Sequence, residues 1–287
     1  MRLIASISLA FLYSWSAAAI ESGDAAIQNR NDHKNRTPAV AKAPHPALQS
    51  TLGFSGYHWI IKDSLEPVGP GPNLFSRRQV WIDPQKRLHL KISRSPGTEA
   101  WQSSEIWPTV ALGYGTYTLN FAVDHPELWD DHVVFGAFTW DYKSDPSQLN
   151  ENREIDFEIS RWGETNSQDA QYVVQPLNEQ KPGSNLHRFD IPWGHALEVI
   201  YTMTWTHTKI SFKTTLITQD HQEHLIAQHE YHGPLNPSPG DARFHLNLWL
   251  FQGKISKPAQ FAGATIRVNR FSFHPLESEP KMQINLK

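Results

Sequence analysis

The sequence of 287 residues contains no cysteine, so the protein has neither a disulfide framework nor a thiolate nucleophile. No later segment reaches the roughly 18 uncharged apolar residues that a membrane-spanning helix needs. The formal net charge is only -3, and no basic run occurs. This charge argues against nucleic acid or an anionic membrane surface as a partner. Because there are no disulfides, stability must come from a hydrophobic core.

Several catalytic and metal-binding motifs are also missing. There is no Gly-x-Ser-x-Gly turn, no phosphate-binding loop and no His-Glu-x-x-His sequence among the 15 histidines. His221, His224, His229 and His232 lie close together in a predicted hairpin, where solvated loop histidines are a better interpretation than a metal site. The sequence therefore disfavours serine, thiol, nucleotide and zinc enzymes.

The N-terminus has the pattern of a secretion signal. Arg2 precedes an apolar stretch over 3–15, and small residues at 17–19 offer a cleavage site, so residues 1–19 are predicted to be a signal peptide. A retained anchor is the alternative. Residues 20–48 carry few large apolar side chains and are predicted to be a flexible leader. The remainder, 49–280, is long enough for one all-β domain in a secreted or periplasmic protein.

Short stretches of alternating apolar and polar residues recur along this domain, and none has a long helical period. The pattern predicts strands within 88–92, 115–123, 133–140, 172–174, 197–205, 209–215, 244–250 and 266–273. Segments 98–108 and 140–152 are predicted to be loops. The number of strands and the chain length favour an all-β sandwich of two antiparallel sheets, with one concave face free for a ligand.

One strand-like segment carries three acidic residues at alternate positions, Glu154, Asp156 and Glu158. In a strand these side chains share one face, while the apolar residues between them pack into the core. Repulsion and partial burial would then separate the pKa values of the three carboxyl groups, as acid and base catalysis requires. Two alternatives remain open from the spacing: a solvated acidic strand face, and a helix surface with Glu154 and Glu158 one turn apart.

The chain is also rich in tryptophan, with 11 residues. Indole rings stack on the C–H faces of sugars, although any single tryptophan in a β-sandwich is more often part of the core. Trp140 at a predicted strand end and Trp162 just after the acidic segment are the better candidates for sugar contacts, because binding residues concentrate where strands meet loops.

The acidic segment resembles the catalytic strand of glycoside hydrolase family 16, whose pattern is Glu-x-Asp-x-Glu. Three further segments are similar to family motifs and occur in the same order: the Tyr-Gly opening at 114–117, the Tyr-Thr-x-x-Trp-Thr hairpin at 201–212, and the Asn-x-Trp strand at 245–249. The resemblance covers roughly 52–275 and implies a jelly-roll β-sandwich. Position 159 is Ile, so the chain has the form without an extra residue before the last Glu, as in lichenase-like glucanases and xyloglucan-modifying transglycosylases.

The resemblance implies a retaining mechanism in which Glu154 is the nucleophile, Glu158 is the general acid and base, and Asp156 assists between them. Such a mechanism needs carboxyl groups about 5 to 5.5 Å apart. Four residues of strand span about 13 Å between Cα atoms, so the two Glu side chains must lean toward each other across a curved sheet.

By the same resemblance, Asn247 and Trp249 join Trp140 and Trp162 as candidate substrate-binding residues. The expected substrate is a β-linked polysaccharide of the glucan type, cleaved internally by a monomer. A transglycosylase on the same substrates and a non-catalytic carbohydrate-binding sandwich remain alternatives. Similar proteins carry a structural calcium ion, but the sequence offers no recognisable ligand set for one, and no cofactor is expected.

Overall fold

A computed structural model describes residues 50–177 and 183–277 of the chain. The predicted signal peptide (1–19) and leader (20–48) lie outside the described residues, as does the end of the chain after residue 277. None of the helices in the described ranges is long and apolar enough to cross a bilayer.

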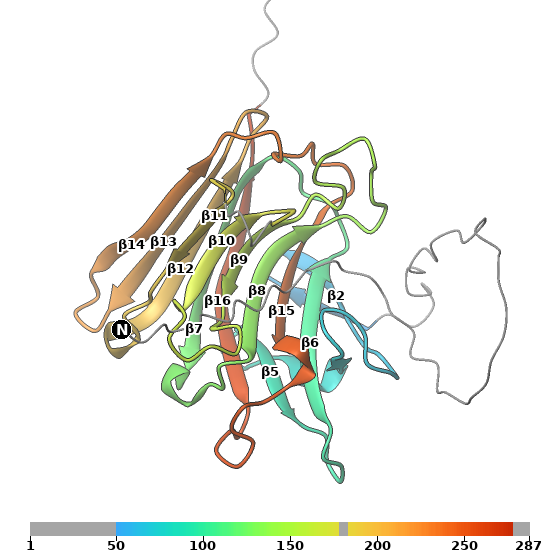
Figure 1. Ribbon diagram of the computed structural model, residues 1–287, viewed down its shortest axis with the longest axis vertical. Helices are drawn as coiled ribbons and strands as arrows, with labels where there is room; N and C mark the ends of the chain where they lie inside the picture. Colours follow the sequence, from blue (N-terminus) through green and yellow to red (C-terminus); the bar gives the residue numbers. More distant parts are fainter. Residues whose placement is uncertain (1–49, 178–182, 278–287) are drawn as a thin grey trace, which may run out of the picture.

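The described chain is built almost entirely from β-strands, which form two antiparallel sheets that face each other (Figure 1). The first sheet has the order β11 (Leu186–Phe189), β10 (Ala170–Val174), β9 (Ile155–Ile159), β8 (Val133–Trp140), β15 (Arg243–Leu250), β6 (Trp101–Pro108), β2 (Tyr57–Ile61) and β1 (Thr51–Phe54). The second has the order β4 (Val80–Ile82), β5 (Leu88–Arg94), β16 (Ala264–Pro275), β7 (Gly115–Asp124), β12 (Ala196–Trp205), β13 (Ile210–Thr218) and β14 (Glu223–Tyr231).

The two sheets are joined at one edge, where Ser93 and Arg94 of β5 pair with Gln102 and Trp101 of β6. A short strand, β3 (Leu74–Phe75), runs parallel to β6 beside this junction. The only helical segments in the described ranges are single 3-10 turns. They are η2 (Arg77–Gln79), η3 (Pro126–Leu128), η4 (Trp193–His195) and η5 (Phe251–Gly253).

The core lies between the sheets and is dominated by aromatic rings. Phe157 of β9 stacks on Tyr201 of β12, with ring centroids 4.4 Å apart, and Tyr172 of β10 stacks on Phe212 of β13 at 4.8 Å. All four rings are nearly inaccessible to water. Burying one such ring stabilises the fold by a few kcal/mol, so these contacts hold the inner face of β9 and β10 firmly against the second sheet.

The predicted all-β sandwich of two antiparallel sheets is therefore confirmed, and each of the eight predicted strands overlaps a strand of the structure. The prediction of a loop over 98–108 is wrong, because residues Trp101–Pro108 form β6 in the middle of the fold. The predicted hairpin around the histidine cluster is formed by β13 and β14, but His224 and His229 lie within β14 and not in a loop. Within the described ranges, no group of three His or acidic residues is arranged to hold a metal ion.

Candidate active site

The acid trio, defined as Glu154, Asp156 and Glu158, lies on β9 and at the position just before it. Ile155 and Phe157 between them are fully buried in the core. Because side chains alternate along a strand, the three carboxyl groups point to the opposite side of the first sheet. The segment is a strand and not a helix, and its acids share one face.

Polar contacts fix the point where the chain enters β9. The Asn150 side chain accepts a hydrogen bond from the backbone N–H of Glu154 and donates one to the Glu154 carbonyl, both at 2.8 Å. The Thr139 hydroxyl donates to the Arg153 carbonyl at 2.6 Å and accepts from the N–H of Ile155 at 3.1 Å. Every backbone group around Glu154 is therefore held, which limits the freedom of its side chain.

The buried side chain of Arg153 fixes the backbone just before β9. The Arg153 guanidinium donates to Asp141 at 3.0 Å, to Asp145 at 2.6 Å and to the Ser238 carbonyl at 2.9 Å. Gly240 allows this approach, because a Cβ at that position would lie 2.5 Å from Arg153 Nε. The network connects the 141–153 loop to the loop before β15, and so positions the residue that precedes Glu154.

Side chains from β10, from the residue just after it and from β11 approach the trio on the same face. Gln171 lies opposite Glu158 in the ladder and donates to its carboxylate at 2.8 Å, while Gln175 donates to Asp156 at 2.9 Å. Arg188 Nε of β11 donates to the Gln171 side-chain oxygen Oε1 at 3.1 Å. The hydrogen bonds from Gln171 and Gln175 stabilise the ionised forms of Glu158 and Asp156, and the charge of Arg188 favours ionised Glu158.

Burial nevertheless raises the pKa of all three acids. It raises the pKa of Glu158 to about 7, although the hydrogen bond from Gln171 and the charge of Arg188 oppose it. The pKa of Glu154 is raised well above its usual value by burial and then by the charge of Glu158. The pKa of Asp156 is raised by burial and by both glutamates, against the hydrogen bond from Gln175.

The trio therefore retains protons near neutral pH. Two glutamates of one strand interact through their charges, and at least one holds a proton that it can give to a leaving group. This is the combination of acid and base that general acid–base and nucleophilic catalysis at a glycosidic bond require.

The predicted substrate-binding residues fall into two groups. Trp140 at the end of β8 and Trp162 after β9 are partly exposed. Asn247 and Trp249 of β15 share the acid-bearing face but are only 2 % and 5 % exposed. Trp249 contacts Trp162, with ring centroids 6.3 Å apart.

Gly136 of β8 separates Asn247 from Glu158, since it pairs with one on each side. A Cβ at position 136 would lie 2.5 Å from Asn247 Oδ1. The glycine thus lets this amide lie flat against the sheet beside Glu158.

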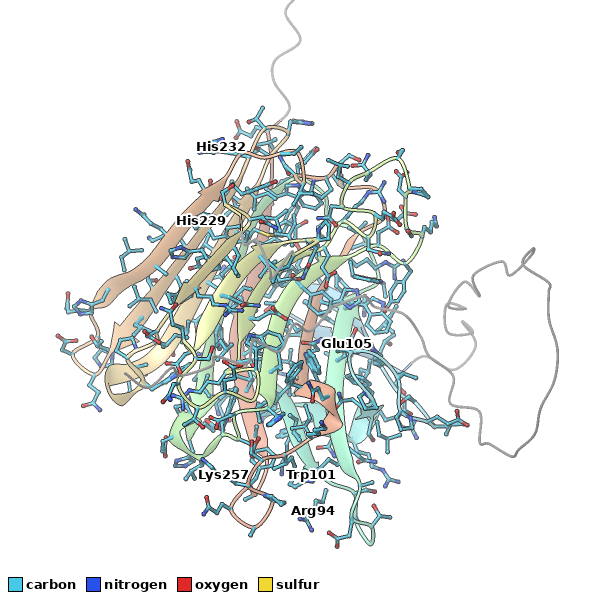
Figure 2. The ribbon with its side chains drawn as sticks, viewed as in Figure 1. Arg94, Trp101, Glu105, His229, His232 and Lys257 are labelled. Carbon is cyan, nitrogen blue, oxygen red and sulfur yellow. The ribbon has the colours of Figure 1, made fainter. Side chains whose placement is uncertain are left out.

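A fourth carboxyl group on this face, which is also buried, was not predicted from the sequence. This residue is Glu105 of β6 (Figure 2). It lies opposite Asn247, accepts a hydrogen bond from Lys62 at 2.7 Å and another from His245 Nδ1 at 3.0 Å. Trp107 stacks on the His245 ring at 5.1 Å. We call Glu105, Lys62 and His245 the Glu105 cluster.

Two signals in the sequence could have identified these neighbours. Gln171 and Gln175 stand at even spacing on either side of Val173, as do the acids on the adjacent strand, so they share a face. His245 precedes Asn247 by two residues and must also share its face. Nothing local in the sequence pairs Glu105 with Lys62, which lies 43 residues earlier.

This chain is similar to known proteins in its three-dimensional structure. No family model matches the chain, and no curated protein sequence matches it either. The Bacillus licheniformis β-glucanase superposes with a TM-score of 0.53 at 16% identity, covering 76% of this chain and 92% of that one. The mixed-linkage glucan GH16 protein of Bacteroides ovatus, solved in complex with its G4G4G3G product, gives a TM-score of 0.53 at 11% identity over 75% of this chain and 94% of that one.

The chain has a glycoside hydrolase family 16-like fold. A third similar structure is described as a pseudo β-1,3-glucanase of Mycobacterium tuberculosis, with a TM-score of 0.53 at 16% identity, covering 76% of this chain and 91% of that one. The family 16-like fold is thus reported both for glucanases and for a pseudo-enzyme, and the function of this chain has to be argued from its own residues.

Proposed function

We propose that this protein is a secreted or periplasmic retaining endo-glycosidase that cleaves a β-linked glucan. The observation that supports the proposal is the acid trio: three carboxyl groups on one face of β9, each with a raised pKa, in a fold shared with β-glucanases. A purely structural acidic surface would be solvated and would not retain protons near neutral pH.

In the proposed reaction the Glu154 carboxylate attacks the anomeric carbon, and the bond to the leaving oxygen breaks as Glu158 donates its proton to that oxygen. A water molecule then gives its proton to Glu158 and attacks the same carbon, which releases Glu154 as a carboxylate. Two displacements, each with inversion, leave the configuration unchanged. Asp156 lies between the two glutamates and stabilises the shared proton.

The mechanism places one demand on the protonation of the trio. In the free protein burial raises the pKa of both glutamates, Gln171 and Arg188 oppose that rise at Glu158, and the charge of Glu158 adds to it at Glu154. Catalysis needs the proton on Glu158 and the charge on Glu154. Moving one proton between the two glutamates meets this demand without a change of net charge, so a single shared proton is sufficient.

A glycan panel tests the proposal. Mixed-linkage glucan, laminarin and xyloglucan are incubated with the protein, and released reducing ends and product chain lengths are measured. We expect cleavage of at least one glucan, with products longer than the starting chains only if sugar instead of water captures the intermediate. Glu154→Gln should lower the rate at least about a thousandfold, since loss of a nucleophile removes the covalent route. Glu164→Gln, which changes an exposed acid six residues after Glu158, should leave the rate unchanged.

A second candidate is a non-catalytic carbohydrate-binding protein. It is favoured by the low exposure of Glu154, Asp156, Asn247 and Trp249, which leaves little of the acid-bearing face open to a sugar chain. Binding of a glucan with no turnover, at the same affinity in wild type and Glu154→Gln, would support this candidate against the enzyme.

A further inference from the structure

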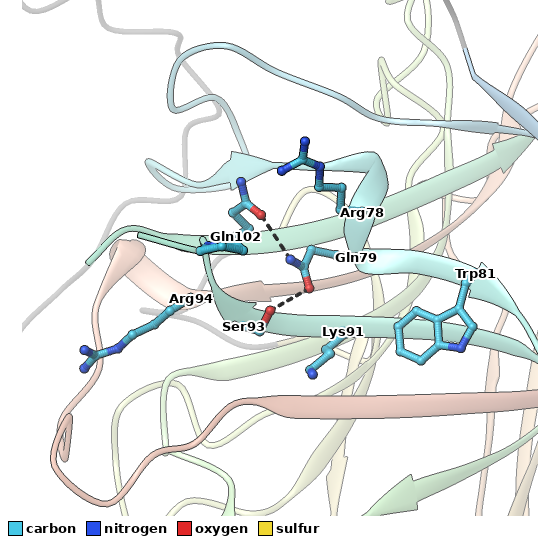
Figure 3. A pocket seen from close by; sticks show the side chains of 8 residues that line it. Arg78, Gln79, Trp81, Lys91, Ser93, Arg94 and Gln102 are labelled. Carbon is cyan, nitrogen blue, oxygen red and sulfur yellow. Dashed lines mark hydrogen bonds between the residues drawn. The ribbon is translucent and has the colours of Figure 1, made fainter. Parts of the chain in front are cut away.

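A separate pocket of about 320 Å³ lies at the edge where the two sheets join (Figure 3). We call it the Gln79 pocket. It is bounded by η2, β4, β5 and β6, and no carboxylate lines it. Its lining includes Arg78, Gln79, Trp81, Lys91, Ser93 and Gln102, with Arg94 at the rim.

The Gln79 pocket is distinct from the acid-bearing face. Gln102 and Glu105 belong to β6 but are separated by an odd number of residues, so their side chains project to opposite faces of the sheet. Glu105 lies in the middle of the sheet, whereas Arg94 and Trp101 lie toward its end (Figure 2). A ligand in this pocket would not contact the acid trio.

The floor of the pocket is a connected row of neutral polar groups. The Ser93 hydroxyl donates to Gln79 Oε1 at 2.9 Å, and Gln79 Nε2 donates to Gln102 Oε1 at 3.0 Å. Gln79 is only 5 % exposed, so the amide at the centre of this row is held rigidly. Within the described ranges, the Gln102 amide N–H groups donate to no protein acceptor. They remain available to a ligand oxygen.

Positive charge surrounds this floor without matching acids. The Arg78 guanidinium and the Lys91 ammonium group form no ion pair with any residue in 50–177 or 183–277. Arg94 pairs with Glu99 and lies over the Trp101 ring at 5.1 Å. Two uncompensated cations beside one cavity attract an anion, and charge-assisted hydrogen bonds to them are stronger than neutral ones.

An aromatic wall completes the pocket. Trp81 of β4 stacks on His89 with ring centroids 4.7 Å apart and nearly parallel planes, and His89 is held by Asp83 at 2.9 Å. The Trp81 side chain is nonetheless 39 % exposed, although it is large and apolar. A fixed and exposed indole beside hydroxyl and amide groups is a surface on which the C–H face of a sugar ring can stack.

We infer that the Gln79 pocket binds an anionic sugar residue, whose ring stacks on Trp81, whose hydroxyl groups bond to Gln102 and Ser93, and whose carboxylate or sulfate lies between Arg78 and Lys91. A bare anion would use the cations but not the indole, and a neutral sugar would use the indole but not the cations. The combination of all three favours a charged saccharide. This inference does not depend on the proposed glycosidase activity.

Isothermal titration of the full chain tests the inference with four probes: an oligosaccharide containing glucuronate, a sulfated oligosaccharide of the same length, a neutral gluco-oligosaccharide and inorganic sulfate. We expect one of the two acidic saccharides to bind at least about tenfold more tightly than the neutral one and than sulfate, and to weaken as salt is raised. The two acidic probes distinguish a carboxylate from a sulfate as the recognised group.

Matched variants locate the binding. Arg78→Gln and Lys91→Gln should each weaken the acidic saccharide about tenfold, because each removes one charge-assisted contact. Trp81→Ala should weaken the saccharide but leave sulfate binding unchanged. Arg77→Gln is the control, since this neighbouring side chain is 62% exposed and does not line the pocket. Thermal unfolding of each variant verifies that it is folded.

The inference is overturned if neither acidic saccharide binds more tightly than the neutral one, if sulfate alone binds as tightly, or if Arg78→Gln and Arg77→Gln behave alike. Loss of glucan cleavage with binding at this pocket intact would reject the proposed function and leave this inference standing.

Discussion

The acid trio and the Glu105 cluster lie on the same face of the first sheet, and Glu154, Asp156 and Glu105 are all buried, yet the carboxyl groups of the two regions behave in opposite ways. Burial raises the pKa of Glu105 too, but the charge of Lys62 and the hydrogen bond from His245 outweigh it and hold the pKa below its usual value. The trio accepts hydrogen bonds from the neutral amides of Gln171 and Gln175, and Arg188 donates to the Gln171 amide oxygen. Partners, and not burial, decide which acid is ionised.

This difference gives the two regions opposite effects on stability. The lowered pKa of Glu105 adds stability above its unfolded pKa near 4.5, and that stability is lost as pH falls through the folded value. The raised pKa of Glu158 adds stability below 4.5, which is lost as pH rises toward about 7. The Glu105 cluster therefore favours the fold at neutral pH, whereas the trio costs stability where it would be catalytically useful.

Removing the cation from the Glu105 cluster should produce the largest change in stability. Lys62→Met leaves a buried carboxylate with only His245 as partner, and we expect the free energy of unfolding to fall by about 3 kcal/mol at neutral pH. Urea denaturation measures this. Lys209→Met, which breaks an exposed pair with Glu230, should lower the free energy of unfolding much less. Equal effects of the two variants would contradict the assignment of Lys62 as the partner that keeps Glu105 ionised.

Removing the guanidinium group of Arg153, the residue before Glu154, should have the next largest effect on stability. Arg153→Leu leaves Asp141 buried without its cation and frees the entry to β9, so we expect a loss of about 2 kcal/mol in stability and a lower kcat. Arg77→Leu is the control, because Arg77 and its ion-pair partner Asp63 are 62% and 52% exposed. Full activity in Arg153→Leu would show that the network does not position Glu154.

Neutralising Glu158 should remove the pH dependence of stability that the burial of this carboxyl group imposes. Because the folded protein holds the Glu158 proton more tightly than the unfolded chain does, Glu158→Gln should gain on the order of 1 to 3 kcal/mol over wild type at about pH 8 and little at about pH 5. Unfolding is measured in denaturant at both values. A gain of the same size at both would mean that the substitution acts through packing and not through charge.

The smallest effect concerns the amide that contacts Glu158. Gln171→Ala removes a hydrogen bond to the ionised form, so the pKa of Glu158 should rise and the alkaline limb of the kcat/KM profile should move up by less than about one pH unit. Gln168→Ala, in the exposed loop before β10, should leave the profile in place. A shift to lower pH would mean that Gln171 stabilises the protonated form instead.

The sequence was informative where one side of a strand faces the core and the other side is polar, as in β9 and β12. It failed for β6, because both faces of this strand are buried and residues such as Ser103, Ser104 and Glu105 lack an alternating pattern. Their polarity is compensated by contacts from distant parts of the chain, including Lys62 and His245. The acid trio was visible in the sequence because its chemistry and its periodicity coincide on five consecutive residues.

The ionisation of the trio could not be predicted in the same way. Burial and the amides of Gln171 and Gln175, in and just after β10, set the pKa values, and both depend on which strands lie side by side. The substrate-binding roles of Trp140, Trp162, Asn247 and Trp249 stay predictions, as does a groove for the polysaccharide. Because these four residues lie on or beside the acid-bearing face, variants of them can test those roles.

The most direct test of the account is to trap the proposed covalent intermediate. A 2-deoxy-2-fluoro gluco-oligosaccharide with a good leaving group should react once with the protein, because the fluorine slows release of the glycosyl group more than its attachment. Mass spectrometry of the digested protein should then place one added glycosyl group on Glu154, and none in Glu154→Gln. An adduct on a different residue, or no adduct on a glucan that the protein cleaves, would contradict Glu154 as the nucleophile and with it the proposed mechanism.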